Sequence, residues 1–278
     1  EIFQNKVIVI KYGGHAMGDK KLAHTFAEDV TLLQKLSIKP VVVHGGGPQI
    51  GSMLDKLKIE SSFIDGLRIT NEETVEIVEM VLSGSINKDI VNKIHAAGGL
   101  AIGLSGKDAK LILANKLTDK FKDPNSNIEK FLDIGFVGKP IKINPSIINI
   151  ISDNLMIPII APVGFGANNE TYNINADTAA GAIASSLKAE RILLLTDVKG
   201  VLDSNKKLIS NISVTKAESM ISDKIITGGM IPKIKTCLET VGSGVKAAVI
   251  IDGRSPHAIL REIFTTGGSG TMIDNNFE

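Results

Sequence analysis

Residues 41–50 read VVVHGGGPQI, and this stretch decides the fold class. Three consecutive valines suit a strand that is buried on both faces. Pro48 suits the first turn of a helix, because the N–H that proline lacks has no partner there in any case. The glycines Gly45, Gly46 and Gly47 therefore join a strand to a helix and leave backbone N–H groups bare beside the positive end of the helix dipole. This arrangement predicts an anion-binding cradle.

A second glycine-rich strand end lies upstream. The apolar run at residues 7–10 leads into Lys11 and then into Gly13 and Gly14. A single glycine pair after a strand more often reflects turn geometry than phosphate binding, but two such loops, one of them with a lysine, indicate a protein that holds phosphate. The chain has neither a Walker sequence nor a G-x-G-x-x-G segment that opens a helix. Neither a P-loop NTPase nor a dinucleotide enzyme is therefore indicated.

Outward from these loops, short apolar segments alternate with amphipathic ones. The alternation predicts an α/β fold, with a mainly parallel sheet covered by helices on both faces. Ligands of such sheets bind at the carboxyl ends of the strands, where both glycine loops fall. The polar segment 120–130 is expected to be a surface loop. We expect strands at residues 6–11, 40–44, 100–104, 156–162, 191–196 and 245–251, helices at 20–36, 48–57, 71–96, 176–187 and 228–241, and hairpins at 61–70 and 163–175.

Bulk composition excludes several classes of protein. Lysine and arginine number 31 against 30 aspartates and glutamates, so no general attraction to nucleic acid or to a membrane is expected. Only 4% of the residues are aromatic and tryptophan is absent, which argues further against stacking on bases. The single cysteine, Cys237, cannot form an internal disulfide, so the chain suits the reducing cytoplasm. No apolar run reaches transmembrane length.

The histidines show no metal-ligand spacing, and no compact zinc-binding cluster occurs. We therefore expect no metal site built by the protein. No Ser-His-Asp or Cys-His pair can be proposed from the sequence. His44 ends a strand and is interpreted as a structural hydrogen-bonding residue rather than a catalytic base.

Two further loops carry candidate ligand-binding residues. Gly229 and Met230 open a helix in which Lys233 falls within the first turns. A lysine there is disfavoured by the helix dipole unless an anion lies between them, although it could also be an ordinary solvated lysine. Residues 196–201 read TDVKGV and follow a strand, which suits a loop at the edge of a nucleotide but equally a plain connection from strand to helix.

Polar residues also gather before the helix at 176–187. Asn173, Asn175 and Asp177 lie there, and one of them could simply cap the helix, but a cap needs only one polar residue. Arg68 lies in the hairpin at 61–70 between apolar neighbours. It could be a surface ion-pair partner, or it could grip a substrate carboxylate through two parallel hydrogen bonds.

Taken in order, these motifs are similar to those of a known family. The chain resembles the N-acetylglutamate kinases of the amino acid kinase superfamily, with a match that runs from about residue 6 to residue 273. The GLRIT hairpin and the NINAD segment carry the assignment to acetylglutamate. The matching motifs are KYGG at 11–14, HGGGP at 44–48, GLRIT at 66–70, NINAD at 173–177, TDVKGV at 196–201 and GMIPK at 229–233.

The resemblance implies ATP-dependent phosphorylation of the γ-carboxylate of N-acetyl-L-glutamate, an early step of arginine biosynthesis. It implies a three-layer αβα sandwich in two lobes, residues 1–175 for the acyl acceptor and dimerisation and residues 176–278 for ATP. Mg²⁺ would accompany ATP with few protein ligands. The implied roles are catalysis for Lys11, Lys233 and Asp177; acceptor binding for Gly46, Gly47, Arg68, Asn173 and Asn175; and nucleotide binding for Gly13, Gly14, Thr196, Asp197, Gly200, Val201, Gly229 and Met230.

The chemistry read from the residues agrees with this implication. A hydroxyl acceptor would need a base to take its proton, and no convincing base is found. A carboxylate acceptor is already ionised at neutral pH, so the difficulty is its repulsion from the phosphoryl group. Two lysines and two N–H cradles address that difficulty.

The carboxyl-terminal segment resembles the ending of arginine-inhibited members of the family. The resemblance implies an allosteric L-arginine site that involves Glu262, Gly268 and Gly270, although Glu262 could also be an ordinary solvated helix residue. Those members carry an amino-terminal helix that links three dimers into a ring, and few residues precede the first expected strand here. We therefore expect a homodimer or a hexamer built as a trimer of dimers, with a PII-type nitrogen regulator as a further candidate partner.

Two other functions are kept as alternatives. The first is another acylphosphate-forming enzyme, of the aspartate kinase or glutamate 5-kinase type. A free amino acid needs a counter-charge for its ammonium group, and Asp65 is the acidic residue available in the hairpin of Arg68. The second is a catalytically silent arginine-sensing protein, against which the presence of Lys11, Lys233 and Asp177 counts.

Overall fold

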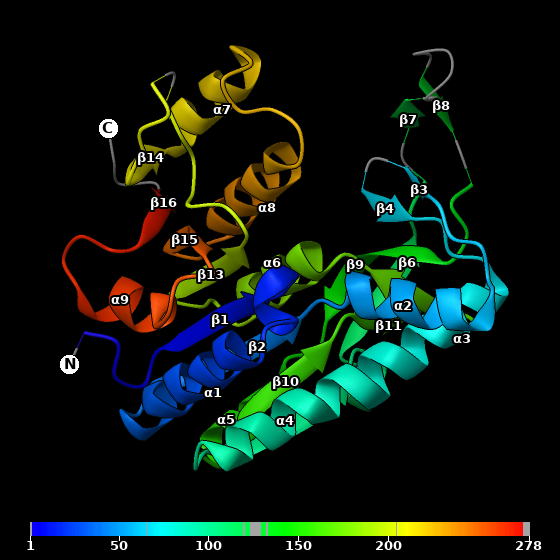
Figure 1. Ribbon diagram of the computed structural model, residues 1–278, viewed down its shortest axis with the longest axis horizontal. Helices are drawn as coiled ribbons and strands as arrows, with labels where there is room; N and C mark the ends of the chain where they lie inside the picture. Colours follow the sequence, from blue (N-terminus) through cyan, green and yellow to red (C-terminus); the bar gives the residue numbers. More distant parts are fainter. Residues whose placement is uncertain are drawn as a thin grey trace.

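The computed structural model describes residues 2–64, 66–118, 120–122, 129–131, 133–203 and 205–274. Its centre is an eight-stranded sheet in the order β14-β16-β15-β13-β1-β2-β10-β5 (Figure 1). All neighbouring strands run parallel except β15 and β16. The strands are β1 (Val7–Tyr12), β2 (Lys39–His44), β5 (Ala101–Ser105), β10 (Ile157–Ala161), β13 (Arg191–Thr196), β14 (Asn211–Ser213), β15 (Ala247–Asp252) and β16 (Gly270–Asp274).

Helices cover both faces of this sheet, because successive side chains of each strand point to opposite sides. Ile8 and Ile10 of β1 belong to one apolar core, and Val9 between them belongs to the other. The expected three-layer αβα sandwich is thus confirmed. The first core is covered by α1 (Lys20–Lys35), α2 (Gly47–Leu57), α3 (Glu72–Glu79), α4 (Asn87–Ala96) and α9 (Ala258–Phe264), and the second by α5 (Ser146–Asp153), α6 (Ala176–Ser186), α7 (Val214–Ser222) and α8 (Met230–Gly242).

The helix expected at 71–96 changes pitch along its length. Between α3 and α4, residues Met80–Ile86 form the π-helical segment η2. Asn71 caps the run, since its side chain accepts a hydrogen bond from the N–H of Thr74 at 2.8 Å. Such π-helical turns often mark functional sites, and η2 lies against the glycine loop that follows β2. Two short 3₁₀ turns are η1 (Gly14–Met17) and η3 (Asp108–Lys110).

A second, smaller sheet closes on itself beside the main one. Its hairpin β11–β12 was expected at 163–175, and the hairpin β3–β4 was expected at 61–70, although Asp65 lies outside the described residues. The small sheet contains β6 (Ile112–Lys116), β9 (Val137–Ile143), β11 (Val163–Phe165) and β12 (Thr171–Ile174), and the separate hairpin contains β3 (Phe63–Ile64) and β4 (Leu67–Arg68).

One expectation about local structure was wrong. The segment 120–130, expected to be a loop, includes an antiparallel pair formed by β7 (Lys120–Lys122) and β8 (Glu129–Phe131). The Lys-Phe-Lys alternation at its start is too short to indicate a strand by itself. Residues 123–128 of this segment lie outside the described residues.

The main sheet continues across the predicted lobe boundary. β1 pairs with β2 on one side and with β13 on the other, so strands from 1–175 and from 176–278 share one ladder. The division into two lobes at residues 175 and 176 stays a prediction. In the described parts of the chain, no helix is long and apolar enough to cross a membrane.

Candidate active site

The glycine loop after β2 has all three of its carbonyl oxygens occupied by protein donors. Those of Gly45, Gly46 and Gly47 accept hydrogen bonds, in that order, from His44 Nδ1 at 2.9 Å, Ile50 N at 2.9 Å and Arg68 Nη2 at 3.0 Å. Because the C=O and N–H of a trans peptide point in opposite directions, the N–H groups of Gly46 and Gly47 point away from these partners. Neither donates a hydrogen bond within the described chain. The loop therefore presents donors to a ligand.

Gly46 and Gly47 have different surroundings. A Cβ atom on Gly46 would collide with Ile86 Cδ1 and lie 2.6 Å from Leu82 Cδ2 of η2, so a larger residue there would displace these side chains. A Cβ atom on Gly47 would meet nothing within 4 Å, and this open space is available to a ligand. The glycine pattern alone does not separate these two cases.

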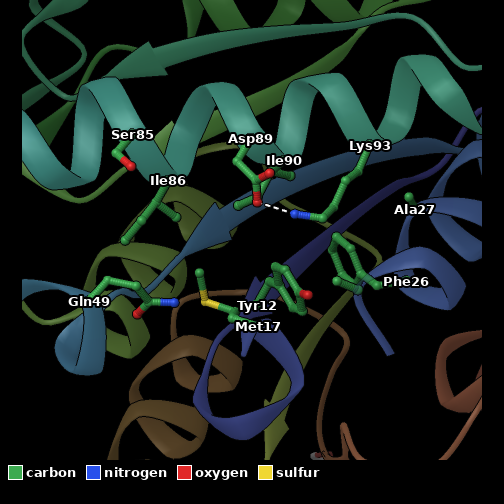
Figure 2. A pocket seen from close by; sticks show the side chains of 11 residues that line it. Tyr12, Met17, Phe26, Ala27, Gln49, Ser85, Ile86, Asp89, Ile90 and Lys93 are labelled. Atoms are coloured by element: carbon green, nitrogen blue, oxygen red, sulfur yellow. Dashed lines mark hydrogen bonds and ion pairs between the residues drawn. The ribbon is translucent and has the colours of Figure 1, made fainter. Parts of the chain in front are cut away.

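The loop after β1 lies beside the loop after β2. A Cβ atom on Gly13 would lie 2.8 Å from Lys11 Nζ and 3.9 Å from the backbone nitrogen of Gly45. Gly14 has φ +69°, a left-handed conformation that suits glycine. The adjoining cavity has a volume of about 130 Å³. Tyr12 of β1 and Ile86 of η2 are among the lining residues shown in Figure 2. The two loops expected to hold phosphate thus meet at one place.

A carboxylate joins the two predicted catalytic lysines. Asp177 Oδ1 lies 3.0 Å from Lys11 Nζ, and Asp177 Oδ2 lies 2.6 Å from Lys233 Nζ. The side chains of Asp177 and Lys11 are each 11% exposed, and that of Lys233 is 21% exposed. Three elements far apart in sequence, β1, α6 and α8, therefore place two ammonium groups on one buried carboxylate.

The charge state of this cluster follows from its surroundings. Burial raises the pKa of Asp177, but the charges of Lys11 and Lys233 and their hydrogen bonds outweigh burial, so the pKa lies below its ordinary value. Asp177 is thus an anion that orients the lysines. It does not suit a general base, because a carboxyl with a lowered pKa binds a proton weakly.

Asn175 and Asn173 have different surroundings. Asn175 is the residue that caps α6, because its side-chain oxygen accepts hydrogen bonds from the N–H groups of Asp177 and Thr178 at 2.9 and 3.1 Å. Asn173 of β12 donates through Nδ2 to Thr70 Oγ1 at 3.3 Å. This bond connects the β11–β12 hairpin to the end of the arginine-bearing hairpin. The acceptor-binding roles predicted for Asn173 and Asn175 stay predictions.

Arg68 is buried and holds no carboxylate among the described residues. It is 7% exposed, donates to Ser61 Oγ and to Gly47 O, and its guanidinium carbon lies 4.5 Å from the centroid of the Phe63 ring. Burial lowers the pKa of the guanidinium, and the charge of Asp55 opposes this. Of the two interpretations left open by the sequence, an exposed surface pair does not fit the burial.

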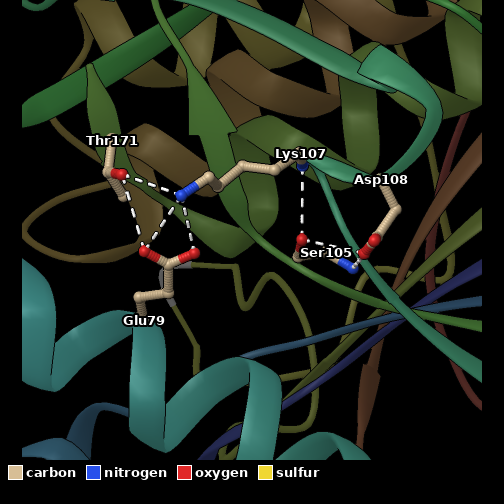
Figure 3. A network of polar contacts seen from close by, with 5 residues as sticks. All are labelled: Glu79, Ser105, Lys107, Asp108 and Thr171. Carbon is tan, nitrogen blue, oxygen red and sulfur yellow. Dashed lines mark hydrogen bonds and ion pairs between the residues drawn. The ribbon is translucent and has the colours of Figure 1, made fainter. Parts of the chain in front are cut away.

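Sequence reasoning missed a polar network that holds the β11–β12 hairpin in place. Lys107 Nζ contacts Glu79 Oε1 at 2.9 Å and Thr171 Oγ1 at 3.1 Å (Figure 3). Beside it, Asp108 accepts from the backbone N–H and the hydroxyl of Ser105 at 2.6 and 2.9 Å. The network joins the end of α3, the loop after β5 and the start of β12. No local motif signals it, because its members are scattered along the chain.

The predicted nucleotide residues lie at the ends of two further elements. Thr196 ends β13, and its hydroxyl lies 3.3 Å from Asp197 Oδ1. A Cβ atom on Gly200 would lie 2.5 Å from Thr271 Oγ1, which accepts from the N–H of Val201 at 2.8 Å. Gly200 and Val201 therefore have a packing role against β16. Gly229 and Met230 begin α8, and a Cβ atom on Gly229 would meet nothing within 4 Å.

Glu262 is not the solvated helix residue that one interpretation allowed. It is 5% exposed, pairs with Arg191 Nη1 at 3.3 Å and accepts from the N–H of Ser269 at 2.7 Å. Burial raises its pKa, and the bonds from Ser269 and Arg191 oppose that rise. Gly268 has φ +61°, and a Cβ atom on it would lie 2.8 Å from Glu262 Oε2. A Cβ atom on Gly270 would collide with the carbonyl of Ile250.

The side chains at the site that could ligate a metal ion bear on how Mg²⁺ would be bound. Within the described residues, no group of three or more histidine, cysteine, aspartate or glutamate side chains could hold a metal ion. Asp177, the carboxylate at the lysine cluster, is already engaged by two cations. These residues fit a Mg²⁺ ion that arrives with nucleotide phosphates rather than one held in a protein cage.

A parallel sheet whose strand ends bring together two N–H cradles and a carboxylate-bridged lysine pair has the features expected of a phosphoryl-transfer site. The chain belongs to the amino acid kinase family, whose family model matches residues 6–252. Two solved structures share the fold. An N-acetylglutamate synthase from Neisseria gonorrhoeae has a TM-score of 0.86 at 19% identity, over 100% of this chain and 61% of that one. A Giardia carbamate kinase has a TM-score of 0.71 at 17% identity, over 98% and 99%.

Sequence relatives narrow the comparison within the family. The chain is 60% identical over 271 residues to the acetylglutamate kinase of Rhodospirillum centenum, a match that covers 98% of this chain and 89% of the relative. It is also 60% identical to the acetylglutamate kinase of Rhodospirillum rubrum, over 98% of this chain and 87% of that one. The resemblance to the N-acetylglutamate kinases is thus confirmed.

Proposed function

We propose that the protein transfers the γ-phosphoryl group of ATP to the γ-carboxylate of N-acetyl-L-glutamate, an early step of arginine biosynthesis. The single observation that carries the proposal is the meeting of Lys11, Lys233 and Asp177 with the free N–H groups of the two glycine loops. Positive charge and N–H donors would stabilise the negative charge shared by the transferring phosphoryl group and the acceptor. The identity to acetylglutamate kinases supports this acceptor.

In the mechanism, the residues bind and orient but abstract no proton. Lys11 and Lys233, held by Asp177, face the transferring group, and the N–H groups of Gly13, Gly14, Gly46 and Gly47 hold oxygens of the phosphate and the acceptor. Arg68 grips the α-carboxylate and Asn173 fixes the acyl side. Thr196, Asp197, Gly229 and Met230 would hold the nucleotide, and Mg²⁺ arriving with ATP would supply further charge neutralisation.

A turnover assay tests this function. The purified chain is incubated with MgATP and, in turn, N-acetylglutamate, glutamate or aspartate, and the acylphosphate is trapped with hydroxylamine. Turnover with N-acetylglutamate alone supports the proposal. A preference for a free amino acid would favour an aspartate kinase or glutamate 5-kinase activity instead. The absence of turnover with all three would favour a catalytically silent protein.

Arg68→Lys is expected to raise the KM for N-acetylglutamate about tenfold to a hundredfold while the KM for ATP changes little. The physical reason is that lysine keeps the charge but loses the planar fork, which removes a charge-assisted hydrogen bond. Steady-state kinetics with each substrate varied measure the effect, and Arg261→Lys on the exposed face of α9 is the matched control. A rise in the KM for ATP alone would remove Arg68 from the acceptor site.

We also propose that the protein works in the cytoplasm as a homodimer or a hexamer. Its activity would be inhibited by arginine, and a PII-type regulator is a candidate partner. L-arginine would bind near Glu262, Gly268 and Gly270. The contact between Glu262 and the guanidinium of Arg191 supports this, because the carboxylate already sits in a place that accommodates a guanidinium and retains lone pairs for another.

Glu262→Ala is expected to abolish inhibition by arginine and to leave uninhibited turnover nearly intact. Arginine inhibits only if it binds two conformations with different affinity, and the variant removes that difference. Calorimetry and inhibition curves measure the effect, with Glu262→Gln as the variant that keeps the side-chain shape and Glu218→Ala as an exposed control. If calorimetry detects no heat of arginine binding to the wild-type chain and arginine does not inhibit it, the proposed regulation is wrong.

A further inference from the structure

We propose that His44 is a positioning residue for phosphoryl transfer, whose Nδ1–H holds the Gly45 carbonyl so that the N–H of Gly46 faces the reacting acceptor carboxylate. The inference rests on the proposed kinase function, since Gly46 is one of the groups that would bind the acceptor. It adds a residue that neither touches substrate nor exchanges a proton. The direction of the Gly46 N–H would depend on the imidazole of His44.

The first step is the tautomer of His44. Nδ1 lies 2.9 Å from Gly45 O, and a carbonyl oxygen can only accept, so Nδ1 carries the hydrogen. Nε2 lies 3.2 Å from Asn87 Nδ2, and an amide nitrogen can only donate, so Nε2 is the acceptor. Both contacts are satisfied by one state of the ring, the neutral Nδ1–H tautomer.

The second step is that Asn87 is itself fixed. Its Nδ2 also lies 2.9 Å from Ile159 O of β10 and 3.2 Å from Leu104 O of β5. Its Oδ1 accepts from Lys88 Nζ at 3.2 Å. The amide cannot be rotated by 180° without placing an oxygen against carbonyl oxygens. Asn87 is fully buried, so no solvent can substitute for these contacts.

The third step is that the ring stays neutral. His44 is 0% exposed, and burial, aided by the charge of Lys88, lowers its pKa to about 4 although the bond to Gly45 opposes this. Protonation would place a second N–H against the amide N–H of Asn87. At neutral pH the ring therefore acts as a fixed donor toward Gly45.

The fourth step carries this order to the ligand. The Gly45–Gly46 peptide is trans, so the N–H of Gly46 points opposite to the oxygen that His44 holds. The other side of Gly46 packs against Leu82 and Ile86 of η2, the segment that leads directly into Asn87. One peptide plane is thus fixed by a hydrogen bond from His44, which contacts Asn87, and by packing against η2, which ends at the residue before Asn87. A preorganised donor of this kind is what stabilises developing charge.

If His44 had only a structural role, the turnover of each variant would follow its thermal stability. Two variants distinguish this role from positioning. His44→Asn keeps an N–H near the position of Nδ1 but loses the group that meets Asn87. His44→Gln keeps a group near the position of Nε2 but loses the donor to Gly45. Thermal midpoints and kcat are measured for both variants and the wild-type enzyme, with MgATP and N-acetylglutamate.

We expect His44→Asn to keep kcat near the wild-type value despite a lower thermal midpoint. We expect His44→Gln to lose about tenfold to a hundredfold in kcat, part of the effect of removing one oxyanion donor, with an unchanged KM for ATP. Turnover that follows the thermal midpoints, or full turnover in His44→Gln, would overturn the proposal. Absent turnover in the wild-type enzyme would instead overturn the proposed function.

A measurement on the unmodified enzyme guards against variants that fail to fold. The ¹³C and ¹⁵N resonances of a buried imidazole report which nitrogen carries the hydrogen. We expect the Nδ1–H tautomer for His44 at neutral pH. An Nε2–H tautomer or an imidazolium would contradict the proposed geometry.

Discussion

Replacing Lys11 or Lys233 with alanine is expected to lower kcat by about a hundred- to a thousandfold, the usual effect of removing one preorganised charge. The KM values of ATP and N-acetylglutamate should change far less. Both ammonium groups lie within 3.0 Å of Asp177, at the place where the two glycine loops meet. In the proposed mechanism, charge at this place lies where negative charge develops during transfer, so its removal should affect the chemical step more than binding.

Matched lysines separate this effect from a general loss of positive charge. Lys6 precedes β1 and Lys235 lies on α8, and both side chains are exposed. Lys6→Ala and Lys235→Ala should leave kcat within about twofold, because exposed charges act weakly through water. Near-normal turnover in either Lys11→Ala or Lys233→Ala would rule out the mechanism with two lysines.

Asp177→Asn is expected to lower the free energy of unfolding by about 3–5 kcal/mol, because it leaves two largely buried ammonium groups without their anion. The pKa of Asp177 is lowered from 3.8, so the wild-type contribution is fully present above that value and is lost only as the pH falls below it. The variant should lack the contribution at every pH. Denaturant unfolding at pH 7 measures the difference.

Two additional measurements make this prediction specific. Asp153→Asn removes an exposed ion pair, Asp153 with Lys39 at 2.7 Å, and should reduce the free energy of unfolding by at most about 1 kcal/mol. Sulfate should raise the thermal midpoint of Asp177→Asn more than that of the wild-type protein, because an anion bound beside the two lysines would replace the negative charge that the variant lacks. Equal stability losses in the two variants would contradict a buried charge cluster at Asp177.

The elements with strong periodic signals were predictable. Six strands of the main sheet, the five expected helices and both hairpins are confirmed, because buried valine and isoleucine runs and amphipathic stretches indicate structure locally. β14 and β16 were not predicted: β14 has only three residues, and β16 begins at glycines that signal a turn. The closure of the small sheet could not be foreseen, because β6 and β9 join the β11–β12 hairpin only through the tertiary fold.

The candidate site shows the same division. The meeting of Lys11 with Lys233 could be expected because both lie at element ends that face one edge of a parallel sheet. The contact of Asn87 with His44 could not be expected, because Asn87 lies within a long helical run and no local motif distinguishes it. The carbonyl bonds of the glycine loop were equally hidden, since Arg68 and Ile50 reach them only in the folded chain.

The central place of β1 has a consequence for how the chain is made. β1 is synthesised before β2 and β13, and β2 soon covers one of its edges, but the other edge is completed by β13, much later in the sequence. Until Arg191–Thr196 has been synthesised, a nascent chain carries an apolar strand with unpaired backbone groups. A pause in translation between these segments would therefore prolong an aggregation-prone state, and a chaperone that shields strand edges would act in this interval.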